Sequence, residues 1–330
     1  PLFTLLACGA TSLTAQDLLG PWISMMQEND LVVRTDRHYT QGLKFTFLSG
    51  EAKADADRWF ARWSDCLPDL GGNFQATRYG VSVGQSIFTP TNITATTLQL
   101  DDRPYAGFLY TALLLQRRGE TAGGHPVLDH WQVDLGVIGP RALGEQAQNT
   151  VHRLRNFGLA NGWDNQVKDE PGIGLKYQRT LVCAAGKADG FEGQFLPHAG
   201  VSLGTSGTYA ATGGQLRGGW RLPRDFGKQT VDSLFPGSGG LPQSGWPGWG
   251  TYVFLGVEGR AVLYNPFLDG GLFHDTHRVA KHPLVGDVKF GWAVSFKYAE
   301  FSYTQVLRSK EYVGQRETDA FGSLALTVRW

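Results

Sequence analysis

The sequence lacks the features that mark several large classes of protein. Its 330 residues include only three cysteines, too few for a disulfide-rich scaffold. The 30 basic and 30 acidic residues cancel, so nothing indicates the concentrated basic surface that nucleic-acid binding requires. No run of about 18 apolar residues could cross a membrane as a helix. HExxH, CxxC, Walker and EF-hand motifs do not occur, which excludes the metal and nucleotide sites that those motifs build.

What the sequence has in abundance is glycine and aromatic residues. It contains 44 glycines and 12% aromatic residues, whereas charged residues make up only 18%. This composition favours many strands with close packing over a helical bundle.

The first residues, "PLFTLLACGATSLTAQ", have the pattern of the second half of a secretory signal peptide. We therefore assign residues 1–15 to a signal peptide remnant and residues 16–330 to one exported domain, with a buried N-terminal strand as the alternative. Cys66 and Cys183 would remain after cleavage. In an oxidising compartment they could form a disulfide, and two buried thiols are an equally plausible outcome.

The last eight residues, "SLALTVRW", alternate apolar and polar residues in the way of a β-strand. Leu324, Leu326 and Val328 share one face, and Arg329 lies on the other. In a soluble sandwich the apolar face would meet a core, whereas in a membrane barrel it would meet lipid and Arg329 would face the lumen. The polar faces of most such segments mix charged with small residues, which favours a lumen.

About twelve alternating segments are present, an even number as in single-chain bacterial barrels. The sequence thus predicts an all-β fold, a transmembrane antiparallel β-barrel of about 12 strands with a short α-helix in an outer loop. Connections 89–103, 140–170 and 264–284 are predicted on the outer side, and 49–76, 184–193 and 222–248 on the periplasmic side. The run "PGSGGLPQSGWPGWG" is predicted to be a flexible connection. The predicted strands are 22–36, 39–48, 77–88, 104–117, 128–139, 171–183, 194–206, 208–221, 249–263, 285–297, 298–308 and 319–330.

Two GxSxG strings, "GVSVG" at 80–84 and "GVSLG" at 200–204, invite comparison with serine hydrolases. A nucleophile elbow requires a sharp strand-to-helix turn at its serine. Both strings lie within alternating segments, so we interpret their small residues as lumen-facing positions and not as catalytic motifs.

The segment "EQAQNTVHRLRNF", residues 145–157, has helical spacing. An apolar stripe of Leu143, Ala147, Val151 and Leu154 is predicted to pack on the barrel, with Gln148 and His152 four residues apart on its flank. A surface histidine without a special task is the alternative. Irregular elements on a regular scaffold often carry function, which makes Gln148 and His152 candidate site residues.

A second polar cluster lies in "QENDLVVRTDRHYTQG". If the first two strands pair as a hairpin, alternation places Asp30 and Thr40 together on the inner face near the outer rim, with Asn29 facing outward. A carboxylate beside an amide oxygen suits a hard cation such as Ca²⁺. Ordinary lumen-lining polar residues are the alternative, and His38 is a rival to His152 for any histidine role.

Several short motifs follow one another along the chain: "END" at 28–30, "YTQGL" at 39–43, "FTP" at 88–90, "DDRPYAG" at 101–107, "GVIGP" at 136–140, "GEQAQNTVH" at 144–152 and "GWDNQ" at 162–166. In this order they resemble the motifs of the LpxR family of outer-membrane lipid A 3′-O-deacylases. The resemblance covers about the first half of the chain, and the second half matches as barrel strands and an aromatic end. It implies that His152 is the general base, with Gln148 beside it.

The resemblance also implies a calcium-dependent part of the site formed by Asn29, Asp30 and Thr40, with Asp30 and Asn29 as metal ligands. One departure concerns the loop after "TP", where enterobacterial family members have a lysine. Here "TPTNITATTLQLDDR" contains none, which leaves Arg103 as the nearest cation for a lipid A phosphate.

These expectations define a function. A hydrolase of this kind would act on lipopolysaccharide in the bacterial outer membrane, as a monomer with Ca²⁺ as cofactor and its site facing the outer leaflet. A phospholipase is a second hypothesis, and a transport or structural barrel without catalysis is a third, since small inward residues could leave an open lumen.

Overall fold

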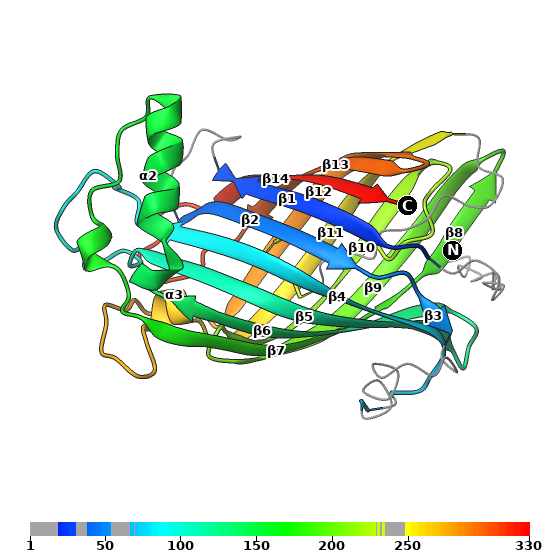
Figure 1. The fold of residues 1–330 in the computed structure, drawn as a ribbon, viewed down its shortest axis with the longest axis horizontal. Coiled ribbons are helices and arrows are strands. Elements are labelled where there is room, and N and C mark those ends of the chain that lie inside the picture. Colours follow the sequence, from blue (N-terminus) through cyan, green and yellow to red (C-terminus); the bar gives the residue numbers. More distant parts are fainter. Residues whose placement is uncertain are drawn as a thin grey trace, which may run out of the picture.

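The structure, a computed structural model, describes residues 19–30, 38–53, 67–68, 70–228, 230–231, 233–234 and 248–330. Twelve long strands form one antiparallel barrel (Figure 1), in agreement with the predicted fold class. They are β1 (Trp22–Asn29), β2 (His38–Leu48), β4 (Gly72–Thr89), β5 (Ala106–Thr121), β6 (Pro126–Ile138), β7 (Glu170–Leu181), β9 (Phe191–Gly204), β10 (Thr208–Trp220), β11 (Trp249–Tyr264), β12 (Leu284–Phe296), β13 (Ala299–Arg308) and β14 (Asp319–Arg329).

Each long strand pairs with its neighbours in the chain, and β1 pairs with β14 to close the sheet. The closing register sets Trp22 opposite Arg329 and Asn29 opposite Gly322. Two short strands were not predicted: β3 (Ala52–Lys53) pairs with β4, and β8 (Cys183–Ala188) pairs with β9. Cys183 therefore begins a strand. Cys66 lies outside the described residues, so its pairing with Cys183 stays a prediction.

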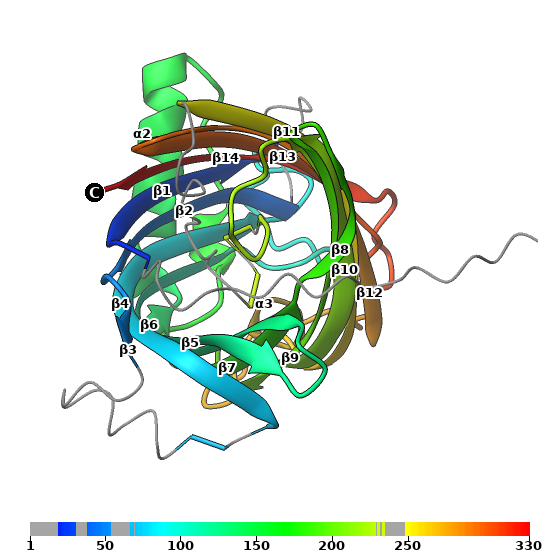
Figure 2. The same ribbon diagram turned by 90° about the vertical axis from the view of Figure 1, so that its right-hand side faces the viewer.

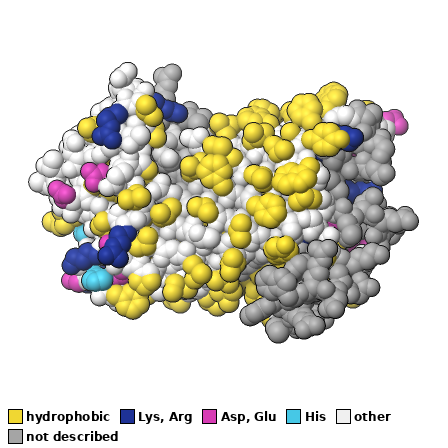
Figure 3. Space-filling model, viewed as in Figure 1, with side chains coloured by type: hydrophobic (Ala, Val, Ile, Leu, Met, Phe, Trp, Pro, Cys, Tyr) yellow, Lys and Arg dark blue, Asp and Glu magenta, His cyan; other side chains and the backbone are white. Residues whose placement is uncertain are grey.

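Alternation along the strands separates an apolar exterior from a polar interior. On the terminal strand Leu324, Leu326 and Val328 are exposed whereas Arg329 is buried, as the sequence predicts for a membrane barrel. Hydrophobic side chains accordingly spread over the strand exteriors (Figure 3). Both GxSxG strings lie inside strands, in β4 and β9. Among the described residues no helix has the length and apolar character needed to cross a membrane.

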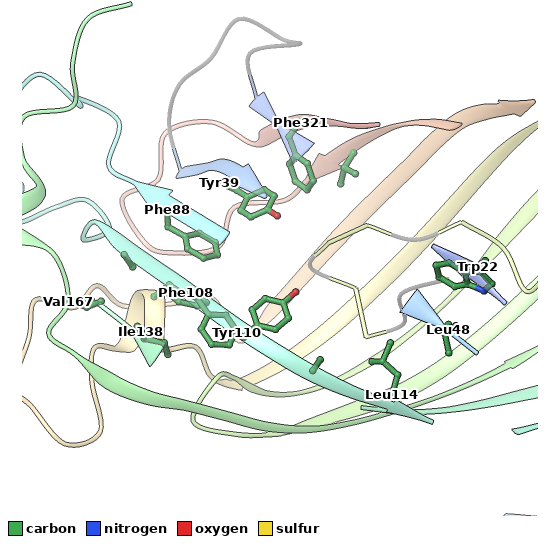
Figure 4. Close-up of a cluster of buried hydrophobic side chains, with 14 residues drawn as sticks. Trp22, Tyr39, Leu48, Phe88, Phe108, Tyr110, Leu114, Ile138, Val167 and Phe321 are labelled. Atoms are coloured by element: carbon green, nitrogen blue, oxygen red, sulfur yellow. The ribbon is translucent and has the colours of Figure 1, made fainter. Parts of the chain in front are cut away.

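Packed side chains fill part of the barrel interior. A buried cluster includes Trp22, Leu48, Leu114, Tyr39 and Phe321 (Figure 4). Large inward side chains from opposite parts of the sheet meet there, which leaves less free lumen than the small inward residues of the sequence suggest.

The connection between β10 and β11, predicted on the periplasmic side, enters the lumen in its described part, whereas the predicted flexibility of the Gly/Pro-rich run stays a prediction. In its described part Asp225 pairs with Arg217 of β10, Lys228 pairs with Glu300 of β13, and both carboxylates are buried. The backbone NH of Val231 reaches a carboxylate on β1. We call residues 222–234, as far as they are described, the lumen strap. It is visible inside the ring in Figure 2. Most of the Gly/Pro-rich run lies outside the described residues.

The connections divide between two ends of the barrel, in agreement with the predicted grouping. Helix α2 (Gly144–Arg155) and the short helix α3 (Pro266–Asp269) lie at one end, here called the α2 end, and the C-terminus lies at the other (Figure 1). At the α2 end Phe267 of α3 stacks on Phe88 of β4, with ring centroids 4.2 Å apart. Helix α3 thereby packs into the mouth of the barrel.

Candidate active site

Helix α2 begins after a 3₁₀ turn, Pro140–Ala142, and its N-cap Leu143 has a left-handed backbone. It ends at Asn156, also left-handed, whose backbone NH reaches the carbonyls of Arg153 and His152. Basic residues occupy the last turn, where they complement the helix dipole. The sequence therefore encodes the C-terminal end of the helix.

The helix packs on the exterior of the barrel wall and not over its mouth. The exterior position Gly107 of β5 allows a close approach, because a Cβ there would lie 3.0 Å from Cβ of Ala142. Gln85 of β4 donates a hydrogen bond to the carbonyl of Ala142 at 2.6 Å. Ile87 of β4 is buried in a cluster with Trp163, against which Ala147 packs. Gly144, Gln148, Asn149 and His152 form the buried face of α2.

This burial corrects the predicted packing of α2. The middle of the apolar stripe, Ala147 and Val151, is half-buried, but Leu143 and Leu154 at its two ends are exposed. The polar residues of the helix are buried instead. Hydrogen bonding to neighbouring loops compensates for this burial and decides which face turns inward.

His152 is buried, and its ring is held by the segment that follows the helix. Nδ1 lies 2.5 Å from the carbonyl oxygen of Gly158. A carbonyl only accepts, so Nδ1 carries the proton and a neutral ring has its lone pair on Nε2. The ring of Phe157 meets the imidazole edge-on, with centroids 6.0 Å apart. These contacts fix both the tautomer and the direction of the ring.

Gln148 and Asn149 attach α2 to the segment that returns towards β7. The indole NH of Trp163 donates to Oε1 of Gln148 at 3.0 Å. Asn149 exchanges two hydrogen bonds with the backbone of Ala160. Trp163 of the motif "GWDNQ" thus fixes the side chain of Gln148, a role that the sequence alone does not indicate.

The structure brings Asn29 and Thr40 together at the α2 end. Nδ2 of Asn29 donates to the carbonyl of Thr40 at 3.2 Å, and the hydroxyls of Thr40 and Thr89 are 2.7 Å apart. Asp30 follows β1 directly and is buried. The three residues therefore lie at the same end of the barrel as His152.

The predicted inward direction of Thr40 is wrong, because a β-bulge interrupts β2. The pairing with β4 shifts between Tyr39 and Gln41, and Tyr39 packs inside the barrel against Phe321. The extra residue reverses alternation at Thr40. Its partner Thr89 lies two residues from Ile87, on the same exterior face of β4. Thr40 therefore lies on the exterior of the barrel, the side on which α2 packs.

Inside the barrel, a second contact joins the same two strands. The hydroxyl of Tyr39 donates to Oε2 of Glu28 at 2.7 Å, and the NH of Val231 in the lumen strap donates to Oε1 at 2.8 Å. Glu28 precedes Asn29 and Tyr39 precedes Thr40. The lumen strap thus supports the strand ends that carry the candidate residues.

Arg103 lies at the mouth of the barrel. Its side chain is buried, pairs with Glu311 at 3.1 Å, and lies over the ring of Phe88 at 4.7 Å. Phe88 points into the barrel, where it stacks on α3. Arg103 therefore makes structural contacts at the mouth of the barrel, and its role as a phosphate ligand stays a prediction.

His38, the rival histidine, belongs to a buried network. Nδ1 lies 2.5 Å from Oδ1 of Asp319, and Nε2 lies 3.0 Å from the hydroxyl of Tyr312 and 3.2 Å from that of Thr91. Tyr312 also donates to Asp102. The contacts join β2, β14 and two connections. His38 therefore links these elements through hydrogen bonds and is surrounded by its partners.

Asp102 and Tyr312 have opposite pKa shifts. Burial alone would raise the pKa of Asp102, but hydrogen bonds from the Tyr312 hydroxyl and from Thr91 hold it below its ordinary value. Burial and the hydrogen bond to Asp102 raise the pKa of Tyr312. The pair is thus built around an ionised carboxylate and a neutral phenol.

The donors near the end of β1 are oxygens of the type that Ca²⁺ takes. Asp30 offers a buried carboxylate, and Asn29, its neighbour in sequence, an amide oxygen. Across the described ranges, no group of three or more His, Cys, Asp or Glu side chains is placed to hold a metal. The donors fit in type, and a cation there would need further oxygens from water or substrate.

Comparison with known proteins places this arrangement in a family. A sequence model of "Outer membrane protein LpxR" matches residues 2–330. LpxR from Salmonella typhimurium superposes with a TM-score of 0.72 at 20% identity, over 94% of this chain and 100% of that chain. The β-domain of the Bordetella autotransporter BrkA is less similar, with a TM-score of 0.46 at 9% identity, over 95% and 100% of the two chains.

A search among curated proteins gave no match. The Salmonella structure supports the barrel fold, and the family match extends over nearly the whole chain. The chain therefore belongs to the LpxR family of outer membrane proteins.

Proposed function

We propose that this protein is a lipid A 3′-O-deacylase that hydrolyses the 3′-linked acyloxyacyl ester at the outer leaflet. The observation that carries the proposal is the placement of His152, which α2 holds beside the exterior of the barrel wall. An ester of an outer-leaflet lipid would approach from that side. Family membership supports a lipid A-modifying role, and lipopolysaccharide is the substrate class that it suggests.

In the proposed reaction His152 acts as the general base. Nε2 accepts a proton from water, and the water oxygen attacks the ester carbonyl. The carbon–oxygen ester bond then breaks, and the 3′ oxygen of the sugar takes the proton from Nε2. The products are the free acyloxyacyl acid and a 3′ hydroxyl. Gly158 stabilises the charged ring through its hydrogen bond to Nδ1.

The remaining residues orient the reactants. Gln148, held by Trp163, lies on the same buried face as His152 and positions water or substrate. Thr40 and Asn29 present polar groups at the neighbouring strands. Asp30, with Asn29, would hold Ca²⁺, which when bound supplies a Lewis acid for the ester carbonyl.

The test compares purified wild type with His152→Gln on lipid A and measures release of the acyloxyacyl acid. Loss of the base should lower turnover about 100-fold or more. His125→Ala is the matched control, because His125 lies in the turn between β5 and β6 at the opposite end of the barrel. Full turnover by His152→Gln would overturn the assignment.

A further inference from the structure

A patch of exposed apolar side chains surrounds the end of α2. Leu154 is 79% exposed, and Phe157 and Leu159 are 44% and 39% exposed. Leu143, at the start of the helix, is 50% exposed. Four large apolar residues within 17 positions are thus left uncovered, although the helix already packs on the barrel through its polar face. We call Leu154, Phe157 and Leu159 the α2 apolar patch.

The α2 apolar patch is not part of the packing between α2 and the barrel, because another side of the helix segment already makes those contacts. Gly107, Gln85 and Ile87 already contact the helix segment or its supporting cluster. The helix runs across the strand direction at the α2 end (Figure 1), as an amphipathic helix at a membrane interface does. Exposed apolar side chains also line the exterior of β4, at Val81 and Val83. The patch therefore has the same apolar character as the strand exteriors that face hydrocarbon.

Positive charge accompanies the patch. Arg153 and Arg155 flank Leu154, and both are exposed. Residues 146–163 contain no Asp or Glu, so the two guanidinium groups face no acidic side chain of their own segment. Arg153 contacts the hydroxyl of Thr150 at 3.4 Å. A surface that combines apolar and cationic groups fits a ligand with acyl chains and an anionic head.

The patch also touches the candidate base. Phe157 lies edge-on to the ring of His152, and its backbone NH donates to the carbonyl of His152 at 2.9 Å. An acyl chain lying along Leu154 and Phe157 would bring its ester end towards the imidazole. The surface is thus placed to orient a bound lipid as well as to hold it.

We infer that the α2 apolar patch, together with Arg153 and Arg155, binds lipid A, the leucines and Phe157 contacting an acyl chain and the arginines a phosphate. The inference rests on the proposed function and names the part of the protein that recognises its substrate.

The test measures binding without turnover. Full-length His152→Gln protein in detergent micelles is titrated with hexa-acyl lipid A, and the apparent Kd is determined. Adding Leu154→Ser with Leu159→Ser should weaken binding about tenfold, since two apolar contacts are lost. Arg153→Gln with Arg155→Gln should weaken it by a similar factor and make it less sensitive to salt. Val253→Ser, on the exposed face of β11, is the matched apolar control and should leave the Kd unchanged.

Unchanged affinity in both double variants would overturn the inference. So would equal displacement of lipid A by phosphatidylglycerol, which would indicate a general lipid surface. A wild-type dimer that the leucine substitutions convert to a monomer would show that a second copy covers the patch. If wild type binds lipid A through these residues but releases no acid, the proposed function fails while the inference stands.

Discussion

The hydroxyl of Tyr39 donates to Oε2 of Glu28 at 2.7 Å inside the barrel, while the side chain of Asn29 donates to the carbonyl of Thr40 at 3.2 Å. The two hydrogen bonds join the same pair of strand ends at adjacent residues. Tyr39 and Gly42 are three positions apart, so strict alternation would place them on opposite faces of β2. The β-bulge between them lets both face inward, which brings the Tyr39 hydroxyl to Glu28. The candidate residues are therefore held by the lumen as well as by their own contacts.

Tyr39→Phe removes the donor to Glu28 and keeps the ring that packs on Phe321. Loss of one buried hydrogen bond should cost about 1–3 kcal/mol. We expect the barrel to fold and kcat to fall several-fold, with KM for lipid A little changed, because the strand ends lose their alignment. Steady-state kinetics with purified protein measure this, and Tyr303→Phe on β13 is a control that removes a hydroxyl hydrogen-bonded to Gln305. Equal effects of the two variants would contradict a positioning role for Tyr39.

Trp163→Phe should reduce turnover by releasing Gln148. The substitution keeps an aromatic ring in the cluster with Ile87 and Tyr105 but removes the indole NH that donates at 3.0 Å. If Gln148 positions water or substrate, Gln148→Ala and Trp163→Phe should each lower kcat, and the double variant should lower it no further than Gln148→Ala does. Additive losses would show that Trp163 acts independently of Gln148.

The barrel should not conduct ions. The lumen strap crosses its interior with the buried pairs Asp225–Arg217 and Lys228–Glu300, and Phe267 packs at the other end. We expect purified protein in planar lipid bilayers to give no steady conductance. Stable open channels of the wild type would favour the transport hypothesis that the small lumen residues Gly200 and Ser202 suggested.

Acid should destabilise the α2 end through Asp102. Its folded pKa lies below the ordinary value, so the folded protein holds this proton less tightly than the unfolded chain does. The stabilisation is fully present above the ordinary pKa of about 4 and is lost as pH falls through the lower folded value. Asp102→Asn should therefore be less stable than wild type at neutral pH and lose less stability on acidification. Urea unfolding in detergent at both pH values measures the difference, and parallel losses in the two proteins would count against the shift.

Much of the fold could be predicted because lipid on one side of each strand imposes a strict alternation. The segment 128–139 was expected as a strand, and β6 spans Pro126–Ile138. Leu326 is exposed and Arg329 buried, as the period of two requires. The position of α2 between two such strands followed from its change of period.

Other features depend on contacts that no local pattern shows. The β-bulge in β2 reverses the direction of Thr40, and no pattern of apolar and polar residues in this strand reveals the bulge. The connection 222–248 was predicted on the periplasmic side, whereas Asp225 and Lys228 of the lumen strap find buried partners on β10 and β13. Arg103 was the nearest cation in sequence, but Glu311, 208 residues away, decides where it lies. The candidate residues could be named from the sequence, but not the faces on which they lie.

Mass spectrometry of lipid A from cells that express the protein tests the central claim most directly. Wild type and His125→Ala should both yield lipid A lighter by one 3′ acyloxyacyl group, and His152→Gln should yield the intact species at equal amounts of folded protein in the outer membrane. Intact lipid A in all three strains, or the same loss in all three, would contradict hydrolysis by the α2 histidine.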